Sequence, residues 1–283
     1  MLTINLLVTI DKNYLKPLEV MLTSLHSNDL ENGYHIWLLH RNLTNEQIAE
    51  LNKFIQTFGW QFNAIKVPEG KFTEPKTTKR YPQEMYYRLL CGELLPIDVK
   101  RVIYLDPDLL TLDSLTDLWN IDLHDNIFAA AAHIGMTDMT TNINKIRLGK
   151  DHPYFNSGVL VIDVDEARKL VSLDKINEVL TKYENELLLP DQDVLNYLYG
   201  DYILQIDEER WNYDARKYLM YLTRSGGQHD IHWLMDHNSI LHFCGKPKPW
   251  EPEHDNHFTA LYLTYRNQAL KVLTKINKNK NPS

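Results

Sequence analysis

The sequence is poor in the residues that cross-link, stiffen or repeat a chain. Its 283 residues include two cysteines, Cys91 and Cys244, which do not form a Cys-x-x-Cys pair. We expect both to be buried free thiols, as is usual in a reducing compartment. The 11 glycines and 12 prolines are too few for a collagen-like or linker-dominated chain. A disulfide scaffold and a fibrous protein are therefore excluded.

Long apolar runs and an excess of positive charge are also missing. No apolar run reaches the roughly 18 residues of a membrane-spanning helix. Residues 1–10 are apolar but lack a basic stretch and a small-residue cleavage site, so they predict a strand and not a signal peptide. The 30 Lys and Arg against 38 Asp and Glu leave a formal net charge of −8. That balance argues against a general nucleic-acid partner.

The composition that remains is that of a globular protein, with 43% hydrophobic and 24% charged residues. A chain of this length buries roughly three quarters of its unfolded surface, which is enough to fold without a disulfide or metal staple. We expect one large domain over residues 1–265, followed over 266–283 by the end of a C-terminal helix and a polar tail. Two short linkers are expected, at 68–82 and 245–252.

Strand and helix patterns alternate along the chain. Thr44, with Gln47 three residues later, has the pattern of a helix capping box. The expected strands are 4–10, 34–39, 62–67, 101–105, 127–132 and 154–164, and the expected helices are 15–25, one opening at Thr44, 85–94, 174–183 and 192–199. This order predicts an α/β protein with a mostly parallel sheet and helices on both faces. Residues 207–238 are rich in aromatic side chains and suggest a small C-terminal cap.

Asp106 and Asp108 follow the strand 101–105, and ligands of such sheets bind beyond the carboxyl ends of the strands. Two carboxylates two residues apart in an extended segment point to the same side, where they repel unless a cation lies between them. Such oxygen ligands suit Mg²⁺ or Mn²⁺. Because Asp-Pro-Asp is also ordinary turn chemistry, both readings stay open on this tripeptide alone.

A second segment, 239–250, combines His242, Gly245, Lys246 and Lys248 with two prolines and a tryptophan. It could supply an imidazole to a metal and ammonium groups to a diphosphate. The alternative is a proline-rich surface turn with solvated lysines.

Three shorter motifs lie at the ends of expected elements. Asp191 and Gln192 stand at the start of the helix 192–199, where one of them could be the N-cap. Asn156 opens the strand 154–164 with Ser and Gly after it. Residues 11–14 follow the first strand, the usual place for a nucleotide, but no G-x-G-x-x-G is present, which disfavours a dinucleotide dehydrogenase.

Taken together and in order, these motifs resemble glycosyltransferase family 8, which includes bacterial lipopolysaccharide galactosyl- and glucosyltransferases and glycogenin. The motifs are Asp11-Lys-Asn-Tyr14, Tyr87-Arg-Leu89, Tyr104-Leu-Asp-Pro-Asp108, Phe155-Asn-Ser-Gly158, Asp191-Gln-Asp193 and His242-Phe-Cys-Gly-Lys-Pro-Lys-Pro-Trp250. The resemblance covers roughly residues 1–265. It implies a Rossmann-like GT-A fold and a retaining hexosyl transfer from UDP-glucose or UDP-galactose, with Mn²⁺ or Mg²⁺ holding the diphosphate.

The resemblance also implies a role for each matched residue. Asp11, Asn13 and Tyr14 would bind the uridine, Tyr14 by stacking. Asp106, Asp108 and His242 would ligate the metal, and Asp106 would also approach the ribose. Gly245 and Lys248 would contact the diphosphate. Arg88, Asn156, Asp191 and Gln192 would surround the sugar, with Arg88, Asp191 and Gln192 as the catalytic group.

The residues agree with such chemistry. A divalent ion and Lys248 would stabilise the charge of a diphosphate leaving group. The pair of carboxylates that glycosidases need is then not required. Gln192 would lie near the anomeric carbon, but an amide is a poor nucleophile. We therefore favour attack by the acceptor on the face that the diphosphate leaves, with a donor phosphate oxygen taking the acceptor proton.

Two departures from the family pattern concern the edges of the site, and a third concerns the C-terminal tail. Lys12 stands where the family often has an acid, and His133 stands where it commonly has an acid on the acceptor side. Residues 135–152, which include Lys145, Arg147 and Lys150, are the expected lid over the donor. The chain ends in a short lysine and asparagine tail, which does not favour docking to a membrane by this segment alone.

Alternatives remain beside the transferase. A sugar-nucleotide pyrophosphorylase would need a glycine-rich basic loop after the first strand, which is missing. A non-catalytic scaffold or chaperone for a partner glycosyltransferase would be expected to have lost a metal ligand, and none is lost. Self-glycosylation on a tyrosine stays open. The expected acceptor is a glycan, glycolipid or glycoprotein, and the expected assembly is a homo-oligomer or a complex with a partner glycosyltransferase. The expected location is a bacterial cytoplasm, free or at the inner face of the membrane, in lipopolysaccharide or polysaccharide synthesis.

Overall fold

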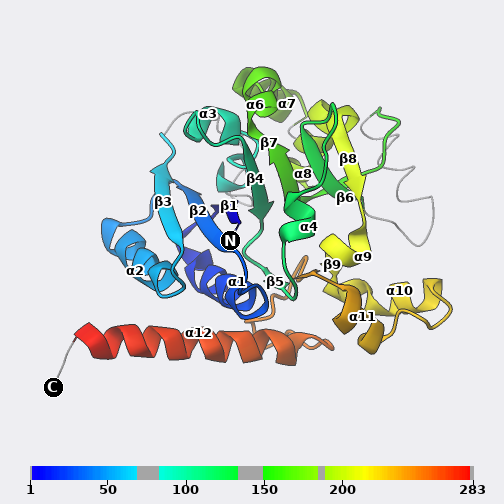
Figure 1. Ribbon diagram of the computed structural model, residues 1–283. Coiled ribbons are helices and arrows are strands. Elements are labelled where there is room, and N and C mark those ends of the chain that lie inside the picture. Colours follow the sequence, from blue (N-terminus) through cyan, green and yellow to red (C-terminus); the bar gives the residue numbers. More distant parts are fainter. Residues whose placement is uncertain (1, 69–82, 133–148, 184–188, 281–283) are drawn as a thin grey trace.

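A seven-stranded sheet with strand order β3-β2-β1-β4-β7-β6-β8 forms the centre of the molecule. The computed structural model describes residues 2–68, 83–132, 149–183 and 189–280 (Figure 1). The strands are β1 (Thr3–Thr9), β2 (Gly33–His40), β3 (Gln61–Lys66), β4 (Arg101–Leu105), β6 (Phe128–Ala132), β7 (Phe155–Asp163) and β8 (Ile203–Ile206). Strand β7 is antiparallel to both of its neighbours, and the other described pairs in this sheet are parallel. The predicted α/β class with a mostly parallel sheet is confirmed.

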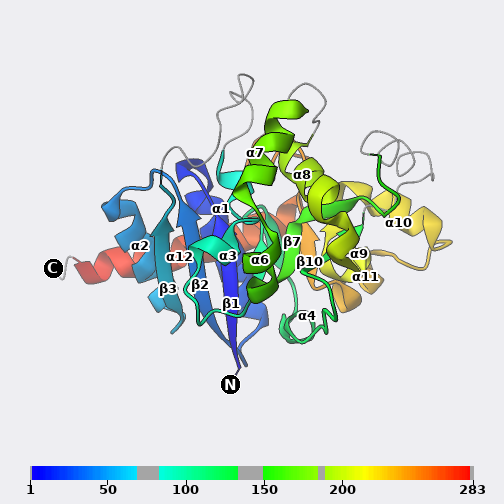
Figure 2. The ribbon, with the colours of Figure 1, turned by 90° about the horizontal axis from the view of Figure 1, so that it is seen from above.

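Helices cover both faces of this sheet (Figure 2). The described helices of the whole chain are α1 (Leu15–Asn28), α2 (Asn45–Gln56), α3 (Cys91–Leu94), α4 (Thr116–Trp119), α6 (Val164–Leu170), α7 (Leu173–Lys182), α8 (Pro190–Tyr199), α9 (Glu208–Trp211), α10 (Tyr218–Arg224), α11 (Ile231–His237) and α12 (Thr259–Lys280), with short 3₁₀ turns η1 (Lys12–Tyr14), η2 (Gln83–Tyr86), η3 (Gly200–Tyr202) and η4 (Ala215–Lys217). Leu6 and Val8 of β1 pack into the core beneath α1 and α2, whereas Leu7 packs into the core beneath α3 and α6 to α8. This period of two buries both faces of the strand.

The capping box of α2 forms as predicted. The Thr44 side chain accepts from the Gln47 N–H at 3.2 Å, and the Gln47 side chain accepts from the Thr44 N–H at 2.9 Å. Such a cap stabilises a helix by about 1 kcal/mol. The buried stripe Leu51, Phe54 and Ile55 then lies against the sheet.

A second, three-stranded sheet was not predicted. It has the order β5-β10-β9, with β5 at Leu109–Thr111, β10 at Ile240–His242 and β9 at Tyr213–Asp214. Strands of two or three residues are too short to show an alternating pattern. This sheet has a decisive effect on the site, because antiparallel pairing of β10 with β5 places His242 opposite Leu109, directly after Asp108. It also joins the cap helices α9 to α11 to the main body (Figure 1).

The prediction of one helix over 85–94 is wrong. The chain forms η2, a turn and the short helix α3, and the side chain of Arg88 turns back so that its Nε donates to the carbonyl of Met85 at 2.8 Å. Gly92 lies against α6, since a Cβ there would be 2.6 Å from the backbone nitrogen of Arg168. The turn η2 and the short helix α3 thus occupy the span where one long helix was expected.

Two smaller expectations also need correction. Helix α8 begins at Pro190 with Leu189 at the N-cap position, so neither Asp191 nor Gln192 caps it. Both cysteines are free, but only Cys91 is buried, and Cys244 is half-buried in the loop after β10.

Helix α12 runs along the base of the molecule and packs against α1 (Figure 1). Ser27 of α1 hydrogen-bonds Gln268, and Asn28 donates to the hydroxyl of Tyr265 at 2.8 Å. The helix therefore crosses residue 265 without interruption and continues to Lys280. Among the described residues, no helix combines the length and the apolar character that crossing a bilayer requires.

Several expectations fall outside the described residues. They are His133, Lys145, Arg147 and most of the expected lid, within 133–148, and most of the first expected linker, within 69–82. Lys150 is described, and its ammonium lies 3.4 Å from a carboxylate oxygen of Asp201.

Candidate active site

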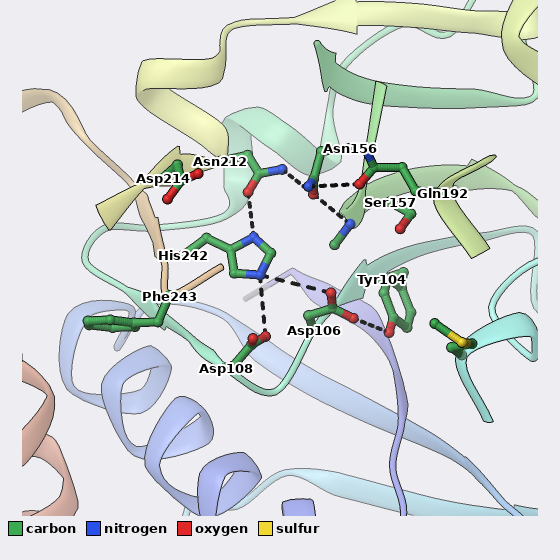
Figure 3. Close-up of polar contacts among 12 residues, drawn as sticks. Tyr104, Asp106, Asp108, Asn156, Ser157, Gln192, Asn212, Asp214, His242 and Phe243 are labelled. Atoms are coloured by element: carbon green, nitrogen blue, oxygen red, sulfur yellow. Dashed lines mark hydrogen bonds and ion pairs between the residues drawn. The ribbon is translucent and has the colours of Figure 1, made fainter. Parts of the chain in front are cut away.

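The three predicted metal ligands meet at the carboxyl end of β4. Asp106 follows β4 directly, and its N–H donates to the carbonyl of Gly158 on β7 at 2.8 Å. His242 Nε2 lies 3.3 Å from Asp108 Oδ1 and 3.9 Å from Asp106 Oδ2 (Figure 3). One ligand atom from each of the three residues lies within 4.8 Å of the others. This spacing allows a single ion to touch all three.

The charged groups at this centre keep Asp108 ionised. Burial would raise the pKa of Asp108, but the neighbouring Lys248 ammonium and the His242 imidazole hold the pKa of this carboxyl well below its usual range. Burial lowers the pKa of His242, but Cys244 and Asp108 beside it raise that pKa above its usual value. Two carboxylates and one imidazole are a donor set that fits Mn²⁺ or Mg²⁺. The described residues therefore fit the divalent ion that the sequence predicts.

Gly158 leaves room for this centre. A Cβ at this position would lie 2.3 Å from His242 Cε1 and 2.8 Å from Asp106 Oδ2. Since real Cβ atoms do not approach other atoms so closely, any larger residue would push both ligands aside. The Asn-Ser-Gly motif is thus in part a requirement for space.

Arg88 connects the metal ligands with the predicted sugar pocket. Its guanidinium lies 3.1 Å from Asp106 and 3.6 Å from Asp191, and it donates to the carbonyl of Ser157 at 2.7 Å. The guanidinium also stacks over the ring of Tyr104, 4.3 Å from its centroid. Burial raises the pKa of Asp191, which Arg88 lowers and Asp106 raises, with a net upward shift. Arg88 therefore holds two carboxylates that would otherwise repel each other.

Gln192 presents a buried amide with an unused donor. Its side chain is 4% exposed, and its Oε1 accepts from Asn156 Nδ2 at 3.2 Å. Its Nε2 has no hydrogen-bond partner among the described residues. Leaving such a donor unpaired costs about 1–3 kcal/mol. An acceptor on a bound molecule would remove this cost.

The last aspartate of the Asp-Gln-Asp motif has a structural role. Asp193 is fully buried, accepts from the Tyr154 hydroxyl at 2.6 Å and accepts from the Leu189 N–H at 3.1 Å. One helical turn later, Asn196 binds both the N–H and the carbonyl of Phe155 at 2.8 Å. These bonds fasten α8 to the start of β7 and so fix the positions of Asp191 and Gln192.

The predicted nucleoside residues lie after β1 as expected. Asp11 accepts from the N–H and from the side-chain amide of Asn13, at 2.8 and 3.0 Å, and caps η1. Tyr14 contacts Trp250 edge-on, with ring centroids 5.7 Å apart. This contact joins the first motif of the chain to the last one.

The loop after β10 is only partly the solvated surface turn that was the alternative prediction. Gly245 and Lys246 are exposed, and Gly245 has a positive φ of 75° with the guanidinium of Arg216 against it. Lys248, by contrast, is 8% exposed and pairs with Asp108. It also donates to the carbonyl of Phe243 at 3.0 Å. The buried lysine therefore belongs to the metal centre.

The sequence analysis assigned no functional role to four residues in or beside this centre. They are Tyr104, Ser157, Asn212 and Arg216. The Tyr104 hydroxyl donates to Asp106 at 2.5 Å, and Ser157 donates to Asp191 at 2.9 Å. Asn212 is 2% exposed and accepts from His242 Nδ1 at 2.8 Å. The available signal for Asn212 was a lone amide between Trp211 and Tyr213, inside a segment that stayed unassigned.

Comparison with known proteins gives the family of this chain. The family model described as "Glycosyl transferase family 8" matches residues 5–254, which is most of the chain. The chain belongs to glycosyltransferase family 8. The resemblance that the sequence motifs predicted is therefore confirmed.

Two bacterial proteins are among the relatives of this chain. It is 27% identical over 263 residues to general stress protein A of Bacillus subtilis, a match that covers 90% of each chain. It is 23% identical over 271 residues to an Escherichia coli lipopolysaccharide 1,2-glucosyltransferase, covering 92% of this chain and 77% of the relative.

Solved structures of two glycosyltransferases superpose on this chain. The galactosyltransferase LgtC, crystallised in complex with donor and acceptor sugar analogues, superposes with a TM-score of 0.79 at 24% identity, covering 94% of this chain and 96% of LgtC. The Streptococcus pneumoniae glycosyltransferase GlyE superposes with a TM-score of 0.70 at 20% identity, covering 99% of this chain and 64% of GlyE. The predicted GT-A fold is confirmed.

Proposed function

We propose that this protein transfers glucose or galactose from a UDP-sugar to a hydroxyl group of a glycan, glycolipid or glycoprotein, with retention at the anomeric carbon. The observation that carries the proposal is the convergence of Asp106, Asp108 and His242 beside Lys248 at the end of β4. Family membership and the relatives in lipopolysaccharide synthesis support it. The complete set of ligands argues against a non-catalytic scaffold.

The donor would extend from Tyr14 to Gln192. We assign Asp11, Asn13 and Tyr14 to the uridine and Gly245 and Lys248 to the diphosphate. Asp106, Asp108 and His242 would hold Mn²⁺ or Mg²⁺, which supplies a positive charge beside the leaving phosphate oxygens. Arg88, Asn156, Asp191 and Gln192 would surround the hexose. In this arrangement the unpaired Nε2 of Gln192 donates to the sugar.

The residues around the hexose bear on the route of the reaction. Asp191 is paired with Arg88 and accepts from Ser157, so its carboxylate is engaged. Gln192 offers an amide, which binds and orients but attacks carbon poorly. We therefore favour attack of the acceptor hydroxyl on the same face that the diphosphate leaves, with a donor phosphate oxygen as the base. Lys248 would meanwhile stabilise the charge on the departing UDP.

The remaining expectations become part of the proposal. We propose that residues 1–265 carry the activity and that the enzyme works in the bacterial cytoplasm, free or at the inner membrane face, as a homo-oligomer or with a partner glycosyltransferase. Arg216 lies against Gly245 and is paired with the buried carboxylate of Asp214, so it would shape this loop without adding net charge.

The first experiment is thermal unfolding with UDP, UDP-glucose and UDP-galactose, each with and without Mn²⁺. A ligand at 100 times its Kd adds about 2.7 kcal/mol of stability, which raises the unfolding midpoint visibly. We expect a shift with UDP that requires Mn²⁺ and is lost in Asp108→Ala. The sugar nucleotide with the larger shift is then tested as donor by measuring UDP release. No shift with any nucleotide would reject the proposal and favour the scaffold.

The role of Gln192 is tested separately. Gln192→Ala removes one hydrogen bond to the sugar, and a bond to a group that gains charge is worth about 1.5–3 kcal/mol, so we expect kcat to fall roughly 10- to 150-fold. A variant with turnover near normal would remove any covalent role for Gln192. Intact mass measured after incubation of the wild-type protein with donor alone also reports self-glycosylation, which would add one hexose.

A further inference from the structure

A chain of buried amides links the metal ligand His242 to Gln192 (Figure 3). His242 Nδ1 contacts Asn212 Oδ1 at 2.8 Å, and Asn212 Nδ2 donates to Asn156 Oδ1, also at 2.8 Å. Asn156 Nδ2 in turn donates to Gln192 Oε1 at 3.2 Å. All four side chains are nine-tenths buried or more. Water therefore has little access to substitute for any of these bonds.

One backbone N–H sets the donor-to-acceptor direction of all the hydrogen bonds between His242 and Gln192. The N–H of Gly158 donates to Asn156 Oδ1 at 2.8 Å, and a backbone N–H can only donate. The Asn156 atom facing Gly158 and Asn212 is therefore the oxygen, so Asn212 must present its NH₂ group there. Its oxygen then faces His242.

Both ends of the chain follow from this direction. Because Asn212 offers an oxygen, His242 Nδ1 must carry a hydrogen, so Nε2, which faces Asp106 and Asp108, is the nitrogen that binds a metal when the ring is neutral. At the other end Asn156 offers its NH₂ group, so Gln192 accepts with Oε1 and keeps Nε2 as a donor without a partner among the described residues. The same hydrogen-bond network thus sets the metal-binding nitrogen and the donor beside the sugar pocket.

We infer that Asn212 is a positioning residue that fixes the imidazole of His242 for metal binding and, through Asn156, fixes the amide of Gln192. This inference rests on the proposed function, since it concerns the same site. Partners of a metal-bound histidine typically change metal affinity by about 10- to 100-fold when they are removed. A residue that serves the fold alone would change stability and leave metal affinity in place.

The protein offers a matched control that distinguishes a positioning residue from a purely structural one. Asn238 is buried to the same extent as Asn212, in the same part of the protein, and donates to the carbonyls of Glu209 and Ile240. It makes no described contact with His242 or Asn156. Asn238→Leu therefore removes buried amide bonds and leaves every hydrogen bond between His242 and Gln192 in place.

The test measures Mn²⁺ affinity at saturating UDP, by the electron paramagnetic resonance signal of free Mn²⁺. We expect Asn212→Leu to bind Mn²⁺ about 10- to 100-fold more weakly than the wild type. Asn238→Leu should unfold at a lower temperature and bind Mn²⁺ as the wild type does. Equal Mn²⁺ affinity in wild type and Asn212→Leu, or equal losses in the two leucine variants, would overturn the inference.

Asn212→Asp separates the two ends of the chain and decides the matter even if Asn212→Leu does not fold. A carboxylate still accepts from His242 Nδ1 but cannot donate to Asn156. We expect Mn²⁺ affinity to be kept and kcat to fall, with KM for the donor changed less. Loss of Mn²⁺ affinity in this variant would refute the role assigned to Asn212. If the wild type itself binds no Mn²⁺ with UDP, the proposed function fails and takes the inference with it.

Discussion

The imidazole of His242 fills the space that a side chain at residue 158 would need: its carbon Cε1 lies 2.3 Å from the point where a Cβ on Gly158 would be. The two residues belong to strands of different sheets, β7 and β10. The absence of a side chain at residue 158 is thus what lets the three-stranded sheet place His242 beside the two aspartates.

Gly158→Ala is therefore expected to damage the metal site more than the fold. Overpacking by one methyl group costs about 1–3 kcal/mol, and the atoms that must move belong to His242 and Asp106. We expect loss of the Mn²⁺-dependent stabilisation by UDP in thermal unfolding. Val159→Ala, which leaves a cavity on the same strand, should lower the unfolding midpoint and retain that stabilisation. If the two variants respond alike to Mn²⁺ and UDP, the packing argument is wrong.

Asp108 and Lys248 form a buried ion pair. Either residue without its partner should lower the stability of the fold. Removing one member of a buried ion pair leaves an uncompensated charge and costs about 3–5 kcal/mol. We expect Asp108→Asn to lose stability of this order in urea unfolding of the metal-free protein. Asp108→Asn combined with Lys248→Met should be more stable than Asp108→Asn alone, because the orphaned ammonium is gone. A double variant that is less stable in urea than both Asp108→Asn and Lys248→Met would contradict this account.

Tyr14 is expected to contribute binding energy for the base of the nucleotide. Stacking of a base on an aromatic ring is worth about 1–3 kcal/mol, so Tyr14→Ala should weaken UDP binding roughly 5- to 150-fold by calorimetry at saturating Mn²⁺. Tyr14→Phe should bind nearly as the wild type does. Tyr183→Ala, at the end of α7 in contact with Tyr197, is the control and should leave UDP affinity unchanged. Equal affinity in Tyr14→Ala and wild type would remove Tyr14 from the uridine site.

Asp29 should give the protein a stability that depends on pH in acid. Burial would raise the pKa of its carboxyl, but hydrogen bonds from Asn32, Tyr34 and Ser114 hold that pKa below its usual value. The stabilisation is therefore complete above the unfolded pKa of about 3.9 and is lost as pH falls through the lower folded pKa.

The matching experiment is urea unfolding of Asp29→Asn between neutral and strongly acidic pH. At neutral pH we expect a loss of about 1.5–3 kcal/mol, because hydrogen bonds to a charged group are removed. The difference from the wild type should shrink as the pH falls below the unfolded value. Asp122→Asn, whose native carboxylate is 77% exposed, is the surface control and should change the stability at neutral pH by less than about 0.5 kcal/mol. A difference that stays constant with pH would show that the charge of Asp29 is not the source of its effect.

Much of the fold follows from patterns that are local in the sequence. The alternation of apolar strands and amphipathic helices predicted the central sheet, and Thr44 with Gln47 predicted the start of α2. Asp106 and Asp108 could be placed at the carboxyl end of a strand because the buried run 101–105 ends directly before them. Such features need only the covalent chain and the periods of helix and strand.

Other features depend on contacts between distant parts of the chain. The pairing of β10 with β5, which brings His242 to Asp108, joins strands of three residues whose partners no local pattern specifies. Asn212 acquires its importance only because Asn156 and His242 lie on either side of it. The two outer aspartates of Asp-Gln-Asp look alike in sequence, yet packing turns Asp191 toward Arg88 and Asp193 toward Tyr154. The sequence by itself determined the layers of the fold and the kinds of group at the site, because these follow from local periodicity and residue chemistry. Only the tertiary structure decided which groups meet, because side-chain direction depends on strand register and on the space that neighbours such as Gly158 leave free.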